Sequence, residues 1–437
     1  MTITYDPHHP KYLDEADVRD EMTRVFEACH GCQRCVTLCT SFPTLFEMIG
    51  RHDDHDAGRL TPAQQDQVTD ECHQCTLCAV GCPYLVGRHE RAIDFPRLML
   101  RAAAMRHDSG QVGLRDRVTT QLMARTDLLG AVGSFAAPTV NKVLSAKPGG
   151  VVRTIIEKTA GVSSVRLLAP FARQRFSTWF KRRPKVRIGQ AQGRVALFPT
   201  CLVEYQEPAV GHDLVKVYER NGIEISLVEA GCCGAPWLHS GDRDHFIKVA
   251  RDNVKALAAE VRRGRDIIVP QPTCGYVLKR DYVDYVPGED AALVAKHTFD
   301  ACEYLMKVHR DPGTALDVDF AGIVPATITY HTPCHLRAQN VGLKSRDLMK
   351  LTGAKITLVQ QCSGIDGMWG LRAENADLSV AVAARLGTEI VRADSEVVAG
   401  DCHLANTAIT EQTGRTSSHP IQVMARAYGI AVEEAST

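Results

Sequence analysis

Cysteine is the residue type in this chain most able to do chemistry, because its thiolate binds metals and takes part in redox reactions. The 437 residues include 16 cysteines, and half of these fall in two short runs with the spacing C-x2-C-x2-C-x3-C. The first run is Cys29, Cys32, Cys35 and Cys39, and the second is Cys72, Cys75, Cys78 and Cys82. A disulfide framework is disfavoured, because a large cytoplasmic chain is kept reduced. The runs therefore predict metal binding or redox work.

The spacing of both runs is that of bacterial ferredoxins, which hold a pair of [4Fe–4S] clusters. In that arrangement three thiolates of one run wrap one cluster, and the fourth thiolate reaches across to the other cluster. We therefore expect a first cluster on Cys29, Cys32, Cys35 and Cys82, and a second on Cys72, Cys75, Cys78 and Cys39. Structural zinc is the alternative, and it usually requires two C-x-x-C pairs rather than two quartets.

Composition and charge exclude several other classes of protein. Lys plus Arg and Asp plus Glu number 51 each, so no overall field favours nucleic acid. No apolar run is long enough to span a bilayer, and the polar, acidic stretch at residues 1–21 does not resemble a secretory signal. No G-x-G-x-x-G loop or P-loop follows a strand, so no flavin, NAD or nucleotide site is expected in this chain. These features predict a cytoplasmic protein, with a peripheral position on the inner face of the membrane as the alternative.

A basic segment with interleaved aromatic residues occupies positions 163–189. Between Glu157 and Glu204 the sequence has no acidic residue. Such a segment can lie on an anionic membrane surface or dock a protein partner. It can equally be a connector whose aromatic side chains pack inward and whose charges are solvated. The sequence leaves these readings open.

The second half of the chain repeats one order of elements. Short strands alternate with helices in residues 191–311 (repeat 1) and again in residues 320–437 (repeat 2), and the strands end at cysteines in register. Repeat 1 offers Cys201, Cys232, Cys233 and Cys274, and repeat 2 offers Cys334, Cys362 and Cys402. Strand–helix alternation predicts parallel α/β layers, in which the loops at the carboxyl ends of the strands converge. Each repeat should therefore gather its cysteines, whereas Cys302 lies within a predicted helix and is expected to be a small buried residue.

The two repeats differ in their thiol content. Repeat 1 reads "GCCG" where repeat 2 reads "QCSG", so Ser363 replaces a cysteine. Repeat 1 is therefore the candidate for a third [4Fe–4S] cluster or a zinc ion. In repeat 2, Cys334, Cys362 and Cys402 with His335 form a candidate degenerate metal site of three sulfurs and one imidazole, and His331 and His403 lie close in sequence. An empty, purely structural repeat 2 is the alternative.

The combination of two ferredoxin-type runs and two cysteine-rich repeats resembles a known family of iron–sulfur proteins. The motifs "TDLLGAVGSFAAPTVN" and "YHTPCH" resemble the iron–sulfur subunits of anaerobic glycerol-3-phosphate dehydrogenase and of glycolate oxidase, and the catalytic subunits of heterodisulfide reductase. The motifs "HLRAQN" and "HPIQVMARAYG" are similar to heterodisulfide-reductase-related proteins that accompany rubrerythrin-like proteins. In this family the pattern C…CCG…CxxC can hold a noncubane [4Fe–4S] cluster. This chain departs from the pattern at Tyr276, Val277, Ser363 and Ala405.

The resemblance implies an iron–sulfur oxidoreductase or electron-transfer subunit that works with a flavoprotein dehydrogenase. Two alternatives remain: a redox partner of a rubrerythrin-type di-iron peroxidase, and a heterodisulfide-type thiol–disulfide reductase, which the missing thiols disfavour. The expected architecture is an α+β ferredoxin-like two-cluster domain with helical insertions over residues 1–110. A helical basic connector over 111–190 and the two tandem α/β cysteine-rich (CCG-type) repeats complete it.

Overall fold

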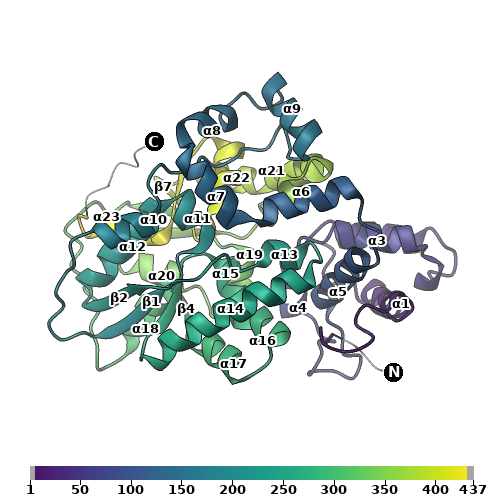
Figure 1. Cartoon of the computed structure of the whole chain (residues 1–437), viewed down its shortest axis with the longest axis horizontal. Helices are drawn as coiled ribbons and strands as arrows, with labels where there is room; N and C mark the ends of the chain where they lie inside the picture. The colour runs from purple at the N-terminus through teal and green to yellow at the C-terminus, as the bar shows by residue number, and fades with distance from the viewer. Residues whose placement is uncertain (1–4, 431–437) are drawn as a thin grey trace. The chain divides into compact units, whose positions relative to one another are not determined.

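The computed structural model describes residues 5–430, apart from the side chains of residues 114–116. The chain divides into two compact units (Figure 1). Unit 1 comprises residues 1–120 and 234–247, and unit 2 comprises residues 121–233 and 248–437. A short stretch of repeat 1, with helix α13 (Ala235–His239), thus belongs to unit 1 although it lies far from the other residues of that unit in sequence.

Unit 1 is built from helices whose apolar faces pack together. These are α1 (Glu15–Cys32), α2 (Ser41–Gly50), η1 (Ala57–Arg59), α3 (Pro62–Asp70), α4 (Leu77–Val80) and α5 (Phe95–Asp108). Along α1 the buried residues Val18, Met22, Val25 and Phe26 recur at helical spacing and form one core with residues of α2, α3 and α5. Among the described residues of this unit there is no strand, only an isolated bridge between Leu85 and Ile93. The α+β class expected here was therefore wrong for the described residues, because amphipathic helices supply most of the core.

The connector between the cysteine runs and the repeats is helical. It contains α6 (Leu114–Ala124), α7 (Thr126–Phe135), α8 (Ala137–Leu144), α9 (Val151–Ala160) and α10 (Phe176–Arg182). On α10, Phe176 is fully buried, Trp179 stacks on His212 with ring centroids 3.9 Å apart, and Phe180 packs against the same core. The aromatic side chains of α10 therefore face inward, while Lys181 and Arg182 are exposed.

The two repeats have the same sheet topology, and all their strand pairs are parallel. Repeat 1 has the order β2-β1-β3-β4, made of β1 (Gly193–Leu197), β2 (Ile223–Leu227), β3 (Asp266–Val269) and β4 (Thr298–Asp300). Repeat 2 has the order β6-β5-β7-β8, made of β5 (Thr327–His331), β6 (Lys355–Val359), β7 (Val397–Gly400) and β8 (Ser417–Ser418). The expectation of two parallel α/β repeats is confirmed.

Helices follow the strands in each repeat. Repeat 1 has α11 (Thr200–Tyr205), α12 (Pro208–Arg220), α14 (Arg243–Arg262), α15 (Pro272–Tyr276), η2 (Val277–Asp281), α16 (Tyr282–Tyr285), α17 (Glu289–Lys296) and α18 (Ala301–Arg310). Repeat 2 has α19 (Cys334–Ala338), α20 (Lys344–Lys350), η3 (Trp369–Leu371), η4 (Ala373–Asn375), α21 (Ala376–Ala393), α22 (His403–Thr413) and α23 (Pro420–Ala427). Apolar residues of both repeats form one shared core, with α12 packed on α23.

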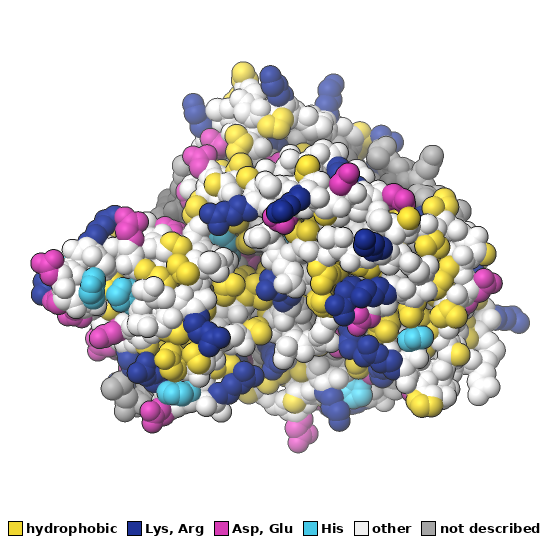
Figure 2. All heavy atoms as spheres, turned by 180° about the vertical axis from the view of Figure 1, so that it is seen from behind, with side chains coloured by type: hydrophobic (Ala, Val, Ile, Leu, Met, Phe, Trp, Pro, Cys, Tyr) yellow, Lys and Arg dark blue, Asp and Glu magenta, His cyan; other side chains and the backbone are white. Residues whose placement is uncertain are grey.

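Two features bear on the surroundings of the chain: the length and apolar character of its helices and the distribution of charged side chains on its surface. None of the helices in the described residues has the length and apolar character needed to cross a membrane. On the face drawn in Figure 2, Lys and Arg side chains stand among acidic and hydrophobic ones, in keeping with equal numbers of basic and acidic residues in the sequence.

Candidate functional site

The first thiol quartet forms in unit 1 around the end of α1. Burial, followed by the nearby thiols of Cys35, Cys82 and Cys32, raises the pKa of Cys29. Cys82 comes from the second run, and the same combination of burial and nearby thiols raises the pKa of Cys35 to about 11. The structure therefore brings the fourth thiol of the second run to the first three thiols of the first run.

The second quartet forms in the same way with the roles of the runs exchanged. Burial raises the pKa of Cys78 well above its usual value, and the thiols of Cys75, Cys72, Cys39 and, with the smallest effect, Cys35 act in the same direction. Cys39 belongs to the first run, so each run sends its last thiol to the other. Six of the eight thiols pack against the hydrophobic core of unit 1: Cys29, Cys35, Cys39, Cys72, Cys78 and Cys82.

Backbone conformations that side chains rarely adopt shape the loops between these thiols. Gln33 ends α1 with φ at 52°, and Gln74 and Thr76 have φ at 46° and 57°. The left-handed region is costly for residues with a Cβ, above all for a β-branched one such as Thr76. The two loops that carry the thiols therefore contain strained backbone positions, as functional sites often do.

Repeat 1 gathers its four thiols at the carboxyl ends of β1, β2 and β3. The thiol of Cys232 interacts with that of Cys201, and this contact together with burial raises the pKa of Cys201. Contacts with Cys232 and Cys274, again with burial, raise the pKa of Cys233. The four thiols thus form a connected group. Directly before Cys201, the buried Thr200 has φ at 63°, a strained conformation for this residue type.

Polar side chains outside the cysteine motif hold the loop that carries Cys232 and Cys233. Asp127 of α7 accepts a hydrogen bond from the backbone N–H of Cys232 at 2.9 Å. Asn253 of α14 donates to the carbonyl of Cys232 at 2.9 Å and accepts from the N–H of Gly231 at 3.2 Å. The hydroxyl of Tyr282 donates to the carbonyl of Cys233 at 2.9 Å. These contacts fix the loop before any group binds to its thiols.

A cavity of about 940 Å³ opens beside Cys201 in unit 2. Basic residues of the connector line one part of it and acidic residues another, and the lining includes Lys181, Arg183, Lys185, Arg187, Asp127 and Glu204. Arg183 forms an ion pair with Glu219 at 2.8 Å. The cavity gives a small molecule access to the thiol group of repeat 1.

The thiols of repeat 2 also lie at strand ends. Cys334 begins α19, Cys362 lies in the loop after β6, and Cys402 precedes α22. Gln271 of repeat 1 donates to the sulfur of Cys402 at 3.1 Å and accepts from the N–H of His403 at 3.3 Å. The loop that leads to Cys274 in repeat 1 is thereby tied to repeat 2.

Of the three imidazoles considered in repeat 2, His335 contacts a thiol and a hydroxyl, whereas His331 and His403 contact oxygen atoms. His335 lies 3.1 Å from the hydroxyl of Thr273 and 3.9 Å from the sulfur of Cys334. His331 contacts the carbonyl of Gln361 at 3.0 Å, and His403 lies 3.7 Å from the carboxylate of Glu207. Ser363 is partly exposed, and the buried Ala405 has no ligand atom in its side chain.

The distances between candidate ligand atoms indicate which groups of side chains are close enough to bind a single metal ion. Within residues 5–430, only Asp300, Cys302 and Asp401 bring three or more candidate ligand atoms within 4.8 Å of one another. The cysteine quartets of unit 1, the four thiols of repeat 1, and the set of Cys334, Cys362, Cys402 and His335 are all more widely spaced. Tetrahedral zinc with bonds of about 2.3 Å to sulfur needs a closer arrangement.

Sequence reasoning missed Asp127, Asn253, Tyr282 and Gln271. Asn253, Tyr282 and Gln271 stand outside any motif, and their roles depend on contacts between segments far apart in the chain. Asp127 gave a usable signal, because it lies within "TDLLGAVGSFAAPTVN" as an acidic residue in the first turn of a helix.

Comparison with known proteins places both repeats in one domain family. The model of the CCG cysteine-rich domain matches residues 195–279 and 328–407. A subunit of anaerobic glycerol-3-phosphate dehydrogenase from Escherichia coli (strain K12) is 29% identical over 401 residues, which cover 83% of this chain and 99% of that protein.

Two further relatives share parts of the chain. Lactate utilization protein A from Geobacillus thermodenitrificans is 31% identical over 193 residues, which cover 41% of this chain and 75% of that protein. A subunit of fumarate reductase (CoM/CoB) from Methanothermobacter marburgensis is 27% identical over 247 residues, 54% of this chain and 46% of that protein. The chain therefore belongs to the family of proteins with CCG cysteine-rich domains that includes this subunit of anaerobic glycerol-3-phosphate dehydrogenase and lactate utilization protein A.

Proposed function

We propose that this protein is an iron–sulfur electron-transfer subunit, which passes electrons between a partner oxidoreductase and an acceptor through two [4Fe–4S] clusters in unit 1. The observation that carries the proposal is the exchange of last thiols, with Cys82 beside the first run and Cys39 beside the second. In two-cluster ferredoxins the last thiol of each run ligates the other cluster, and this arrangement matches that exchange. Independent zinc sites have no need of it.

The spacing of the thiols supports clusters over zinc. The cysteine sulfurs that ligate a cubane cluster stand further apart than the ligand atoms of one metal ion, because the four iron atoms of the cluster lie between them. Neither quartet lies within the 4.8 Å that marks a single-ion group among the described residues. The donor set of four thiolates is also the one that [4Fe–4S] clusters use.

In this proposal each cluster has its own ligands: Cys29, Cys32, Cys35 and Cys82 for the first, and Cys72, Cys75, Cys78 and Cys39 for the second. Such clusters accept and release single electrons. The residues of the chain bind them and set their surroundings. The core of unit 1, with Phe42 and Leu45 among its members, covers one side of both thiol groups and limits the access of water. Burial of this kind is one of the levers that set a reduction potential.

Repeat 1 is the proposed place of a third cluster, held by Cys201, Cys232, Cys233 and Cys274. Asp127, Asn253 and Tyr282 hold its loop in place, and the cavity beside Cys201 leads to it. Repeat 2 has three thiols, and the one imidazole that contacts a thiol, that of His335, is shared with the hydroxyl of Thr273. Its proposed role is to support repeat 1, to which Gln271 ties it.

The names of the relatives suggest the class of partner. One relative is a subunit of a dehydrogenase and another is a subunit of a fumarate reductase, so both are parts of multi-subunit oxidoreductases. A flavoprotein dehydrogenase subunit is accordingly the proposed partner, and a rubrerythrin-type protein is the alternative. Affinity purification of the tagged chain from its native host under anaerobic conditions, followed by mass spectrometry, distinguishes the two.

Serine substitutions at the exchanged thiols test the proposal. Cys82→Ser should disturb the electron paramagnetic resonance signal of one cluster, and Cys39→Ser that of the other, with dithionite-reduced full-length protein in both cases. Cys362→Ser, which lies outside both quartets in repeat 2, is the matched control and should leave both signals intact. Two colourless, zinc-loaded quartets after anaerobic reconstitution would overturn the proposal.

A further inference from the structure

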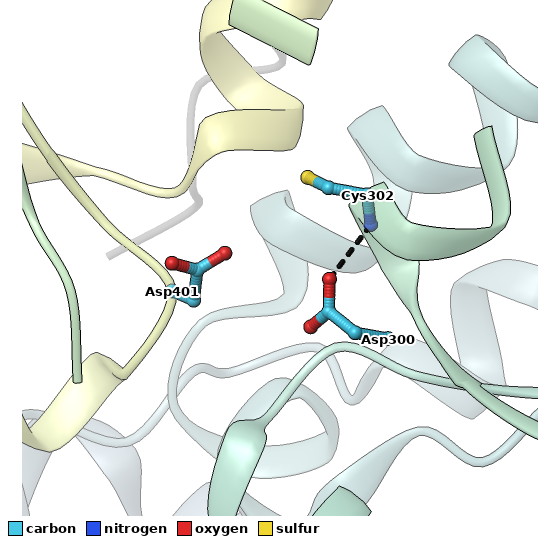
Figure 3. Close-up of side chains that lie close together, drawn as sticks. All are labelled: Asp300, Cys302 and Asp401. Carbon is cyan, nitrogen blue, oxygen red and sulfur yellow. Dashed lines mark hydrogen bonds between the residues drawn. The ribbon is translucent and has the colours of Figure 1, made fainter. Parts of the chain in front are cut away.

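Two carboxylates and a thiol that belongs to none of the cysteine motifs meet in the interior of unit 2 (Figure 3). Asp300 ends β4 and caps α18, Cys302 lies in the first turn of α18, and Asp401 directly follows β7. Their ligand atoms all lie within 4.8 Å of one another. Asp300 is 2% exposed, and Cys302 and Asp401 are fully buried.

Hydrogen bonds hold Asp401 in place but leave one oxygen of Asp300 without a partner. The hydroxyl of Tyr330 donates to Oδ2 of Asp401 at 2.6 Å, and the hydroxyl of Ser345 donates to Oδ1. Oδ1 of Asp300 accepts from the N–H of Cys302 at 2.9 Å, whereas its Oδ2 is buried and forms no hydrogen bond. Burying a carboxylate oxygen unsatisfied is costly.

Among the described residues, no basic side chain forms an ion pair with either of these acids. The nearby Lys279 pairs instead with Glu303 at 2.8 Å. A bound cation would satisfy the free oxygen of Asp300 and offset the charge of both carboxylates.

We propose that Asp300, Cys302 and Asp401 bind a structural zinc ion that joins the two repeats. Zinc accepts carboxylate oxygen and thiolate sulfur together, whereas magnesium and calcium prefer oxygen alone. Tetrahedral zinc sets its ligand atoms roughly 3.5 Å apart, so binding draws the three side chains slightly closer. A hydroxyl or a water molecule completes the fourth position.

The placement of the ligands gives the ion a structural role. Asp300 and Cys302 belong to repeat 1 and Asp401 belongs to repeat 2, so the zinc fastens β4 and α18 to the end of β7. The next residue is Cys402, one of the three thiols that repeat 2 retains. The ion therefore anchors the strand end of the repeat that has lost two of its thiols. Because the ligands are buried, zinc enters as the repeats fold together and exchanges slowly afterwards.

Metal analysis and zinc-edge X-ray absorption of the anaerobically purified, full-length protein test this proposal. We expect one zinc per chain, with one sulfur neighbour at about 2.3 Å and the remaining neighbours oxygen at about 2.0–2.2 Å. Asp300→Asn and Cys302→Ser should each lose this zinc while iron per chain stays unchanged. Asparagine is as good a helix cap as aspartate, so Asp300→Asn keeps the start of α18. Tyr330→Phe is the control, because it removes a hydrogen bond to Asp401 but no ligand, and it should keep the zinc.

Three results would overturn the proposal. The first is wild-type protein that holds no zinc after dialysis against a zinc buffer, which would mean that the carboxylates share a proton. The second is a zinc ion with three or four sulfur neighbours, which would place it in a cysteine repeat. The third is zinc retained in a folded Asp300→Asn variant, with the fold checked by circular dichroism.

Discussion

The carboxylate of Asp127 accepts a hydrogen bond at 2.9 Å from the backbone N–H of Cys232, which lies 105 residues further along the chain. Helix α7 of the connector thereby holds the loop that carries two of the four thiols of repeat 1. The connector is thus part of the support of the thiol site as well as a link between the cysteine runs and the repeats.

Replacing Asp127 tests this role. Asp127→Ala leaves the N–H of Cys232 without its partner, so we expect the free energy of unfolding to fall by about 1–3 kcal/mol. Iron bound in unit 2 should fall with it if repeat 1 holds a cluster. Asp127→Asn keeps an acceptor oxygen and should retain most of the stability and most of the iron bound in unit 2. Asp290→Ala removes an exposed carboxylate paired with Arg262 and is the control, with an expected change below about 1 kcal/mol. Equal behaviour of the Ala and Asn variants would contradict the assigned role.

Two glycines of α7 should resist substitution. A Cβ on Gly130 would lie 2.3 Å from the ring of Tyr205, and a Cβ on Gly133 would lie 2.7 Å from the ring of Phe171. Gly→Ala within a helix otherwise stabilises it by up to about 1 kcal/mol. We expect Gly130→Ala to destabilise the protein by about 1–3 kcal/mol through overpacking. Gly50→Ala, where nothing lies within 4 Å of the new Cβ, is the control. Chemical denaturation of the wild-type protein and of the Gly130→Ala and Gly50→Ala variants measures this difference. A Gly130→Ala variant more stable than the wild type would contradict the close contact with Tyr205.

The basic segment 163–189 separates into structural and exposed charges. Arg183 pairs with Glu219 at 2.8 Å and both side chains are largely buried, so Arg183→Glu should lower the melting temperature. Lys181 and Arg182 are exposed, and reversing both to Glu should change the free energy of unfolding by less than about 0.5 kcal/mol.

Binding assays on the same variants test the two open readings of the segment. If it contacts an anionic membrane or a partner, reversal of Lys181 and Arg182 should weaken sedimentation with anionic vesicles or recovery of the partner. Unchanged association would leave the segment as a connector whose aromatic residues pack inward.

His419 makes stability depend on pH. It caps α23, accepts at Nδ1 from the N–H of Ile421 and contacts the carbonyl of Pro270 through Nε2, and burial lowers its pKa from the usual 6.5 to about 4. Between these values the unfolded chain binds a proton that the folded chain does not, so stability falls as the pH drops from 6.5 towards 4. One proton contributes at most about 1.4 kcal/mol per pH unit.

The matched variant for this prediction is His419→Asn, which keeps an acceptor for the helix cap and has no titrating group. Urea unfolding at several pH values should show a shallower loss of stability between pH 6.5 and 4 than in the wild-type protein. An identical slope in both proteins would rule out His419 as a source of the pH dependence.

Much of the fold could be predicted because it follows from local patterns. Strand–helix alternation in both repeats predicted parallel sheets, and the structure has them. Cysteines such as Cys201 and Cys334 lie at the expected strand ends. The helical character of unit 1 was harder to predict, because the two cysteine runs dominate its sequence pattern. That residues 234–247 join unit 1 depends on tertiary packing, which periodicity does not report.

The candidate sites divide in a similar way. Three thiols of each proposed quartet lie in one short motif, so their proximity follows from the sequence, whereas the fourth comes from the other run and its position depends on the fold. Cys302 was expected to be only a small buried residue, and it is buried, yet its neighbour Asp401 lies in the other repeat. No sequence pattern joins residues 302 and 401, since only the shared core of the repeats brings them together. The polar side chains that hold the Cys232 loop could not be predicted either, because they come from segments far apart in the sequence.

The central claim is that unit 1 holds two [4Fe–4S] clusters with exchanged fourth ligands. The most direct test is iron and acid-labile sulfide per chain, with Mössbauer spectra, on full-length protein in which Cys201 and Cys274 are both serine so that repeat 1 contributes nothing. Two cubane clusters would give about eight iron and eight sulfide per chain, all in clusters that dithionite reduces. Zinc in place of iron, or iron that falls to about four without loss of any of the eight thiols, would contradict this claim.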